Sequence, residues 1–571
     1  MARLKGLNRN LVSNFKEHIT STNEKRNLIL SILKSTTTKR EAKNYINKYQ
    51  NQFNDGNSTE RSSADLTTRD AQRDIVINRY LNQHNPFINI YDDEKKIQRI
   101  PLRLGIFKIR PSSIQRNLWK GIIETFKRLK MLGLSCVVLL DFDELSSNSF
   151  KHNEYYIMDQ TNKMMNHFEN SSYNRPLDTT VSRLLFTKNQ ESAGYSIDQM
   201  EQVLIPLYQD RIPVIQPIVF DSLTGEQGFA KSDEMLKSFC RGLLNTNDLL
   251  TIEKVVILDP KGGIPSIERN KSSHIFINLS QEYSDIQAEL KKGFLSTRDF
   301  TSHFTNIECM HEILTSIFEK VGNDDATGLI TTPEIMSINS DELNPIIYNV
   351  LADRPIISFS LPSSHSTTPE VSTSIIKKGI DVKVYNSDGS DENFTLSSLF
   401  EKGIIDKDKL INLLNDSFKK NLDTSNYFSR IDKNLATIII VGDYDGASII
   451  TWEKSDLMSG KVAYLDKFAI ASANQGLPGL ADIIFKLILQ SQPDEIIWRS
   501  RRNNPVNKWY FQRSCGSLCT SSQWKLFFTG SIFNKRISKF NNSKSSTSID
   551  IGKKLDGYMD IIESIPPSFS K

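Results

Sequence analysis

Three cationic side chains in the C-terminal part of the sequence, Lys467, Arg499 and Arg501, have a spacing suited to binding carboxylates. Arg499 and Arg501 are two positions apart in a strand-like segment, so both side chains project to one face of a sheet. Lys467 lies at the end of what we expect to be the adjacent strand, residues 461–469. Guanidinium groups bind carboxylate oxygens through paired N–H donors, so three converging cations are physically suited to an acceptor with two carboxylates.

A glycine-bearing turn, residues 475–479, separates the two strand segments and leads into a helix. The helix is indicated by apolar residues with the spacing of one buried face: Leu480, Ile483, Ile484, Leu487 and Ile488. A turn followed by a helix N-terminus presents unpaired backbone N–H groups, which bind anions. The order strand, turn, helix and strand therefore predicts a phosphate-binding site.

Several motifs around these residues resemble a known family. In chain order they are YLDKF at 464–468, QGxxG at 475–479, WRSR at 498–501, NPxNxWYF at 504–511 and a strand at 524–528. They are similar to the acetyltransferase domain of fungal N-acetylglutamate synthases, a variant of the GNAT acyl-CoA fold. The resemblance implies transfer of an acetyl group from acetyl-CoA to the amino group of L-glutamate, the first step of arginine biosynthesis, without a metal.

The resemblance also assigns roles in acceptor binding and proton transfer. The three cations would bind the glutamate carboxylates, and Tyr464 would line the acceptor pocket. The glutamate amine is protonated near neutral pH and must lose a proton before it attacks. Asn504 would orient the amine or a water that removes this proton, and Tyr510 would protonate the departing CoA thiolate. Asn504 also fits a helix N-cap before Pro505, and Tyr510 by itself fits a packing residue.

Binding of CoA would fall to the backbone of the strand end and of the turn. The thioester carbonyl and the pantetheine arm would be bound by Phe468, Ala469 and Ile470. The pyrophosphate would be bound by Gln475, Gly476 and Gly479. Pro478 stands where the usual GNAT turn has its first glycine, so the turn must be shifted, because proline removes a backbone donor.

Apolar strands alternate with amphipathic helices from about residue 75 to 360, which predicts a largely parallel sheet covered on both faces. This half resembles the amino acid kinase fold of the same family, which implies that it binds arginine as a feedback inhibitor. A kinase of this fold needs a glycine pair beside a strand-end lysine, but Arg-Pro-Ser-Ser follows Ile109. The only Lys-Gly-Gly, 261–263, fits a tight turn, so phosphate transfer is not expected.

Two other functions are compatible with parts of the sequence. The chain could be an arginine-sensing regulatory partner of acetylglutamate kinase with weak or no transferase activity, a possibility that Pro478 keeps open. The intact set of predicted catalytic and acceptor-binding residues argues against it. An amino acid kinase is disfavoured by the missing glycine pair.

Bulk composition limits the class of protein further. With 571 residues the chain is too long for one core, and two domains are expected. A net charge of +4 gives no argument for a nucleic acid partner, and no apolar run approaches the length of a membrane span. Five scattered cysteines indicate a reducing compartment, and Cys515 and Cys519 lack the neighbours of a zinc site.

The first residues are basic, amphipathic and poor in acid, as in a mitochondrial transit peptide, and the family works in the mitochondrial matrix. The expected organisation has six parts. They are a transit peptide at 1–25, a helix with a polar linker at 26–74, a regulatory domain at 75–362, a linker at 363–376, an acetyltransferase domain at 377–533 and a polar tail at 534–571. Acetylglutamate kinase and further copies of the chain are the expected partners.

Overall fold

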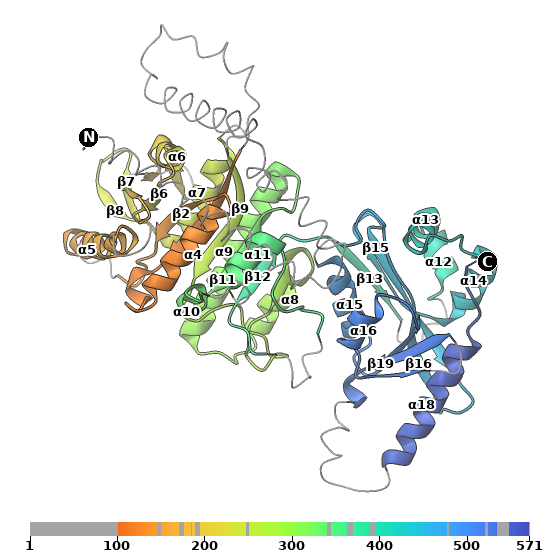
Figure 1. Cartoon of the computed structure of the whole chain (residues 1–571). Coiled ribbons are helices and arrows are strands. Elements are labelled where there is room, and N and C mark those ends of the chain that lie inside the picture. Colours follow the sequence, from red (N-terminus) through yellow and green to blue (C-terminus); the bar gives the residue numbers. More distant parts are fainter. Residues whose placement is uncertain are drawn as a thin grey trace, which may run out of the picture. The chain divides into compact units, whose positions relative to one another are not determined.

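The structure is a computed structural model of the chain, and it separates into two compact units. Unit 1 comprises Met1–Ile357 with Glu370–Gly379, and unit 2 comprises Ser358–Pro369 with Ile380–Lys571 (Figure 1). The predicted transit peptide and the helix with its linker lie outside the described residues. The described residues are 101–145, 150–170, 176–183, 185–188, 194–246, 250–339, 344–361, 369–387, 394–458, 460–476, 479–519, 523–533 and 547–569.

Unit 1 is built on an eight-stranded sheet with the order β10-β12-β11-β9-β1-β2-β6-β3. All neighbouring strands are parallel except β11 and β12. The strands are β1 (Leu102–Ile109), β2 (Leu134–Leu140), β3 (Thr179–Ser182), β6 (Ile212–Ile215), β9 (Leu250–Leu258), β10 (Phe276–Asn278), β11 (Thr327–Thr331) and β12 (Ser374–Lys377). This mostly parallel arrangement confirms the predicted fold class.

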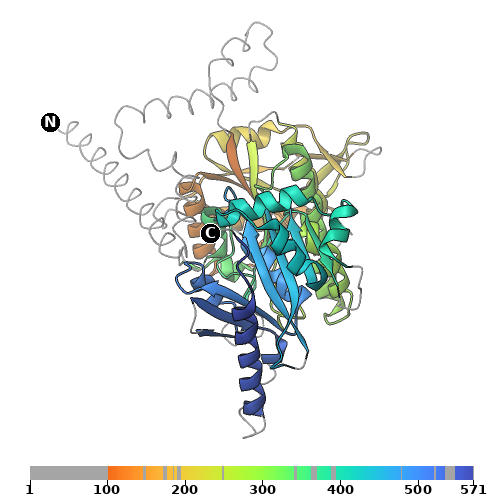
Figure 2. The same cartoon turned by 90° about the vertical axis from the view of Figure 1, so that its right-hand side faces the viewer.

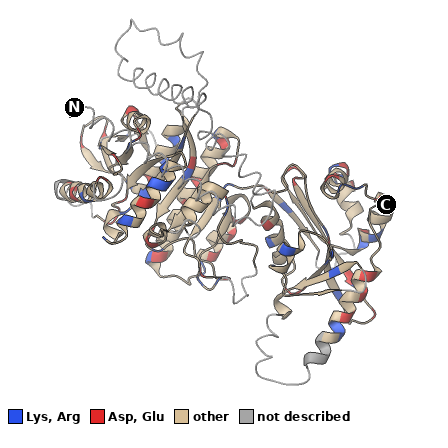
Figure 3. Cartoon of the chain, in the orientation of Figure 1, with Lys and Arg blue, Asp and Glu red and all other residues tan. Residues whose placement is uncertain are grey.

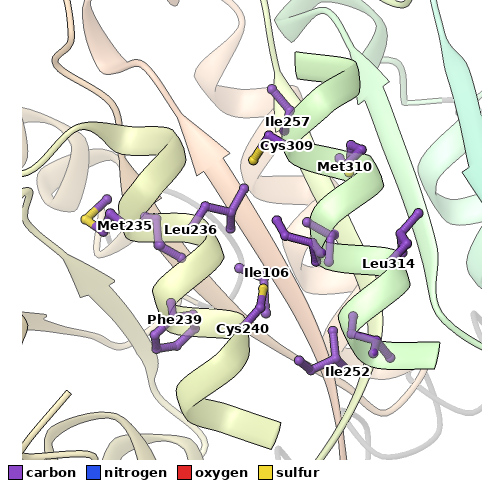
Figure 4. Packing of buried hydrophobic residues seen from close by; sticks show 14 of the residues in the cluster. Ile106, Met235, Leu236, Phe239, Cys240, Ile252, Ile257, Cys309, Met310 and Leu314 are labelled. Atoms are coloured by element: carbon purple, nitrogen blue, oxygen red, sulfur yellow. The ribbon is translucent and has the colours of Figure 1, made fainter. Parts of the chain in front are cut away.

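The helices of unit 1 pack on this sheet or on one another. They are α4 (Trp119–Met131), α5 (Phe150–Phe168), α6 (Glu201–Tyr208), α7 (Ser232–Leu244), α8 (Leu279–Leu290), α9 (Thr297–Val321), α10 (Pro333–Met336) and α11 (Pro345–Ala352). Figure 4 shows part of the core, where α7 and α9 pack on β1 and β9. Leu236 and Met310 are fully buried there, as expected for helices whose apolar stripe faces a sheet.

A second, four-stranded sheet in unit 1 has the order β5-β4-β7-β8. Its strands are β5 (Tyr195–Ile197), β4 (Phe186–Lys188), β7 (Ile218–Asp221) and β8 (Gln227–Phe229). The sequence predicts one strand over 212–220, but β6 and β7 belong to different sheets. Pro217 lies between them, and because proline has no N–H to continue a ladder, it marks the change of sheet.

Unit 2 contains a seven-stranded sheet with the order β13-β14-β15-β16-β17-β19-β18. Its neighbours are antiparallel except β16 and β17, which are parallel. The strands are β13 (Val382–Asn386), β14 (Leu435–Val441), β15 (Gly446–Lys454), β16 (Lys461–Ile470), β17 (Ile496–Arg501), β18 (Gly516–Cys519) and β19 (Trp524–Thr529). The strand predicted at 461–469 and the one predicted at 524–528 both form.

The helices of unit 2 are α12 (Leu396–Glu401), α13 (Lys407–Phe418), α14 (Thr424–Ile431), α15 (Leu480–Ser491), α16 (Asn507–Phe511) and α18 (Thr547–Ser564). Helix α15 begins where the glycine turn predicts it. Its expected apolar face is buried, with Ile484 and Ile488 fully inaccessible to solvent. Helices α13 and α14 pack with β14, β15 and the end of β16 in one apolar cluster.

The expected polar tail is wrong for residues 547–564, which form α18 and pack against β17 and β19 (Figure 2). Tyr558, Ile561, Ile562 and Ile565 follow the spacing of one helical face, and all are buried. Figure 3 shows charges of both signs along α18, which give its other positions a polar character. The apolar stripe was present in the sequence, but the lysine- and serine-rich residues before it obscure it.

The expected linker at 363–376 is also placed too far along the chain. Ser374–Lys377 form β12, which lies between β10 and β11 in the main sheet of unit 1. Ile375 and Ile376 are buried, since a strand inside a covered sheet faces apolar side chains on both sides. Serine and threonine around 363–374 suggest a linker by composition, but β pairing decides the structure of its last residues.

All five cysteines are free thiols, with Cys519 exposed and Cys515 partly exposed. In the part of the chain that the structure describes, no helix combines the length and apolar character of a membrane span. Acidic and basic residues are interspersed along the ribbons of both units, as Figure 3 shows.

Candidate active site

A β-bulge in β16 determines where its polar side chains point. Leu465 pairs with Ile450 of β15, and the next pair joins Lys467 to the adjacent Ile449. Asp466 is therefore an extra residue without a partner in the ladder. A bulge shifts the alternation of side chains by one position, so Leu465 and Lys467 lie on opposite faces although they are two apart.

As a consequence, the bulge brings the predicted acceptor-binding residues to a single face. Tyr464 pairs with Ile497 of the parallel strand β17, so their side chains share a face. Arg499 and Arg501 alternate with that residue and lie on the same face. Lys467 joins them only because of the bulge. The structure thus brings Tyr464, Lys467, Arg499 and Arg501 together, as the sequence predicts.

Lys467 is held in a buried setting. Its ammonium donates to the carboxylate of Asp466 and to the hydroxyl of Ser568 at 3.0 Å, and it lies 4.4 Å from the centre of the Tyr427 ring. The Lys467 side chain is 8% exposed. Burial lowers the pKa of Lys467, although the charge of Asp466 opposes this shift.

Asp466 joins Lys467 to a wider network that the sequence analysis did not predict. The Asp466 side chain is 1% exposed and also accepts from the guanidinium of Arg430 and from the hydroxyl of Tyr427. Burial by itself would raise the pKa of Asp466, but the neighbouring Lys467 and Arg430 charges lower it. Arg430 also donates to Glu453 at 2.9 Å. No sequence pattern links α14 to this strand, because the contact depends on tertiary packing.

Arg499 and Arg501 differ in their surroundings. The guanidinium of Arg499 is half-buried and donates to the carbonyls of Ile562 at 2.6 Å and Ile565 at 2.8 Å, at the end of α18. It also lies 4.3 Å from the ring centre of Trp524. Arg501 is exposed, with its guanidinium 5.9 Å from the same ring. Arg499 is therefore partly committed to the fold, whereas Arg501 faces solvent.

Asn504 lies in the turn after β17. Its position before Pro505 suggests an N-cap, but it is not the N-cap of α16. The N-cap is Val506, whose N–H donates to the side-chain carbonyl of Asn504 at 3.1 Å. The amide nitrogen of Asn504 donates to the hydroxyl of Ser500 at 3.0 Å. These two bonds fix the side chain in one orientation.

Tyr510 is buried among aromatic rings. Its ring centre lies 5.6 Å from that of Trp498 and 5.5 Å from that of Phe527. Burial raises the pKa of Tyr510 to about 12, so its phenol stays protonated at neutral pH. Ser500, which bonds to Asn504, and Trp498, which packs against Tyr510, alternate with Arg499 along β17. Asn504 and Tyr510 therefore contact the face of the sheet opposite the cations.

The ladder between β16 and β17 is short. Its pairs are Ala463 with Ile496 and Tyr464 with Ile497, and the following residues of the two strands do not pair with each other. Phe468, Ala469 and Ile470 belong to this part of β16. Beyond these pairs the ladder does not join the two strands, and the cations lie on one face of the sheet whereas Asn504 and Tyr510 contact the other.

The structure describes the two glycines that flank the middle of the predicted pyrophosphate turn. Gly476 and Gly479 have φ values of 89° and 92°, a left-handed conformation that disfavours residues with a Cβ. Gly479 is the N-cap of α15 and makes no side-chain cap bond. The side-chain amide of Gln475 donates to the carbonyl of Ile470 at 3.0 Å, which ties the turn to β16. Pro478 lies outside the described residues.

Comparison with known proteins identifies the family. Residues 390–547 match the family model of the N-acetyltransferase domain of N-acetylglutamate synthase. The chain is 57% identical to the mitochondrial amino-acid acetyltransferase of Debaryomyces hansenii, with all of both chains covered. It is 36% identical to that of Yarrowia lipolytica, over 89% of this chain and 90% of the relative.

The chain belongs to the mitochondrial amino-acid acetyltransferase family. It is therefore an enzyme that transfers acetyl groups, and acetyl-CoA is its co-substrate, as the sequence analysis predicts. Among solved structures, N-acetylglutamate synthase from Neisseria gonorrhoeae with coenzyme A and N-acetyl-glutamate is similar with a TM-score of 0.39 at 10% identity. That comparison covers 75% of this chain and 94% of the other.

Proposed function

We propose that this amino-acid acetyltransferase uses L-glutamate as its acceptor and makes N-acetyl-L-glutamate. The observation that supports this most strongly is the group of cations on one face of β16 and β17. Lys467, Arg430 and Arg499 carry three positive charges, and the neighbouring Asp466 and Glu453 carry two negative charges. The exposed Arg501 adds a further positive charge. A dianionic acceptor balances the remaining positive charge.

The chemistry then takes place where β16 and β17 no longer pair. The deprotonated amine attacks the thioester carbonyl, the C–N bond forms and the C–S bond breaks. Asn504 orients the amine or a water that accepts its proton. Tyr510 gives its proton to the departing thiolate, for which the protonated phenol is the required form.

Acetyl-CoA would approach from the turn and the strand end. Gly476 and Gly479 lie just before the N-terminus of α15. A pyrophosphate is favoured at a helix N-terminus by the N–H groups of the first helical turn and by the helix dipole. The backbone of Phe468, Ala469 and Ile470, in the part of β16 not paired with β17, would bind the pantetheine arm and the thioester carbonyl.

Release of free CoA from acetyl-CoA, with and without L-glutamate, tests the acceptor. Wild type should release CoA only with glutamate, and Arg501→Ala should raise the KM for glutamate roughly tenfold, as expected for a lost charged contact. Arg502→Ala is the matched control, since Arg502 is also exposed, lies just beyond β17 and is not a predicted acceptor-binding residue. No glutamate-dependent release from wild type would contradict the proposal.

Unit 1 is proposed to regulate the transferase by binding arginine, as the family resemblance implies. Two observations in the described part of unit 1 argue against phosphate transfer. Lys108, near the end of β1, is buried and paired with Asp233 at 2.5 Å, and its pKa is raised because Asp233 and Asp141 outweigh the effect of burial. Gly262 forms the expected tight turn, with its N–H donating to the backbone carbonyl of Asp259.

ATP-dependent phosphorylation of N-acetylglutamate should therefore be absent. Arginine, in contrast, should lower the acetyl-transfer rate.

The mitochondrial location agrees with the names of the relatives, and we propose the matrix as the compartment. Association with acetylglutamate kinase and with further copies of the chain remains part of this proposal. Size-exclusion chromatography of the protein with and without the kinase tests both contacts.

A further inference from the structure

The residues that follow α18 reach the predicted acceptor site. Beyond its bonds to Ile562 and Ile565, the guanidinium of Arg499 donates to the carbonyl of Pro566 at 3.3 Å. Two residues later, the hydroxyl of Ser568 accepts from the ammonium of Lys467 at 3.0 Å. One short segment therefore contacts both the buried Lys467 and the half-buried Arg499, two of the cations assigned to the acceptor.

The same segment is fixed to unit 2 on its other side. The N–H of Asp423 donates to the carbonyl of Ser568 at 3.0 Å, and Phe569 forms a β-bridge with Leu422. The ring of Phe569 lies 4.9 Å from that of Phe418, measured between centres. Together with the buried face of α18, these contacts make the segment a built-in part of the domain.

We propose that Ser568 is a positioning residue for acetyl transfer, which holds the Lys467 ammonium in place for a carboxylate of the acceptor. This inference rests on the acceptor site proposed above. An ammonium has three N–H donors, and Lys467 directs one to Asp466 and one to Ser568. Its remaining hydrogen bond, to the backbone carbonyl of Asp466, is long at 3.4 Å, so one donor can turn to the acceptor beside the ring of Tyr427.

The hydroxyl of Ser568 suits this role because it is neutral. Asp466 already supplies a charge to Lys467, and a second carboxylate would cancel the positive charge that the acceptor needs. A hydroxyl fixes the direction of the ammonium without neutralising it. The anchors at Leu422 and Arg499 restrict the position of the hydroxyl, so that the lysine is ordered before the acceptor binds.

The test compares Ser568→Ala and Ser568→Thr in the full-length enzyme. Ser568→Ala should raise the KM for glutamate about five- to tenfold and leave the KM for acetyl-CoA unchanged, as expected for one hydrogen bond to a charged group. Ser568→Thr keeps the hydroxyl and should restore a KM for glutamate close to wild type. Ser564→Ala removes a hydroxyl that donates to Ile561 within α18, and it serves as the matched control.

A merely structural role of Ser568 would lower the thermal midpoint without this selective change in KM. A wild-type KM for glutamate in Ser568→Ala would overturn the inference while the acceptor proposal stands. A lower KM in Ser568→Ala would overturn it too, because it would show that the segment obstructs the acceptor. Absence of glutamate-dependent CoA release in wild type would overturn the acceptor proposal and this inference together.

Discussion

The guanidinium of Arg499 and the carbonyl of Ile562 are 2.6 Å apart, although the two residues are separated by 63 positions. This bond joins a residue predicted to bind substrate to a helix that the sequence analysis assigns to a polar tail. A cation at the C-terminal end of a helix also interacts favourably with the helix dipole. Arg499 therefore has a role in stability in addition to its proposed role in binding.

Replacement of Arg499 should destabilise unit 2, whereas replacement of Arg501 should not. Arg499→Ala removes the bonds to Ile562 and Ile565, so we expect the free energy of unfolding of unit 2 to fall by about 2 kcal/mol. Arg501→Ala should change it by less than about 0.5 kcal/mol, because Arg501 is exposed. Tryptophan fluorescence during urea unfolding reports unit 2, since Trp119 is the only one of the five tryptophans outside it. Equal unfolding midpoints for the two variants would contradict the role of Arg499 at α18.

Asp466→Asn should be among the most destabilising single substitutions in unit 2. It leaves the buried Lys467 and the half-buried Arg430 without their shared carboxylate, which costs about 3 kcal/mol for a broken buried ion pair. Asp443→Asn is the control, because its partner Lys409 and the Asp443 side chain are both exposed. The measurement is again the urea midpoint, and a loss no larger than in Asp443→Asn would show that the network adds little stability.

The lowered pKa of Asp466 predicts a pH dependence of stability. The folded state holds this carboxylate ionised, whereas the unfolded chain protonates it at a pKa of about 3.9. Its stabilising contribution is therefore complete above about pH 4 to 5 and is lost as the pH falls through the folded pKa. Urea midpoints measured from pH 7 down to pH 3 should decline less steeply in Asp466→Asn than in wild type. Parallel declines would contradict this.

Tyr510→Phe should lower kcat by about 100-fold if the phenol protonates the thiolate, with the KM for glutamate nearly unchanged. Since burial raises the pKa of Tyr510 to about 12, its deprotonation should not limit kcat in wild type at any pH below 10. Tyr444→Phe, in the turn between β14 and β15, removes a hydroxyl that accepts from the N–H of Asp406 and is the control. Wild-type kcat in Tyr510→Phe would exclude the phenol as proton donor.

Local patterns were enough to predict much of unit 2. The strand at 461–469, the glycine turn and α15 each depend on residues close together in the sequence, and so does the terminal strand from Trp524. Helix α16 begins later than Asn504 and Pro505 suggest, with Val506 as its N-cap, although the side chain of Asn504 still accepts from the N–H of Val506 as a capping side chain does. Residues of α14, above all Arg430, could not be foreseen, since nothing local connects them to Asp466.

The sequence by itself determined the types of residue in the site, the order of the strands and helices around it and the resemblance to an acetyltransferase family. It did not determine which face carries Lys467. Strict alternation from Tyr464 would turn Lys467 away from Arg499, and only the extra residue Asp466 in the β15–β16 ladder reverses this. Likewise, the contacts of Ser568 and Ile562 with the cations arise when α18 packs its apolar face on the sheet. Strand register and helix packing bring together residues that are distant in the chain, so only the tertiary structure decides these contacts.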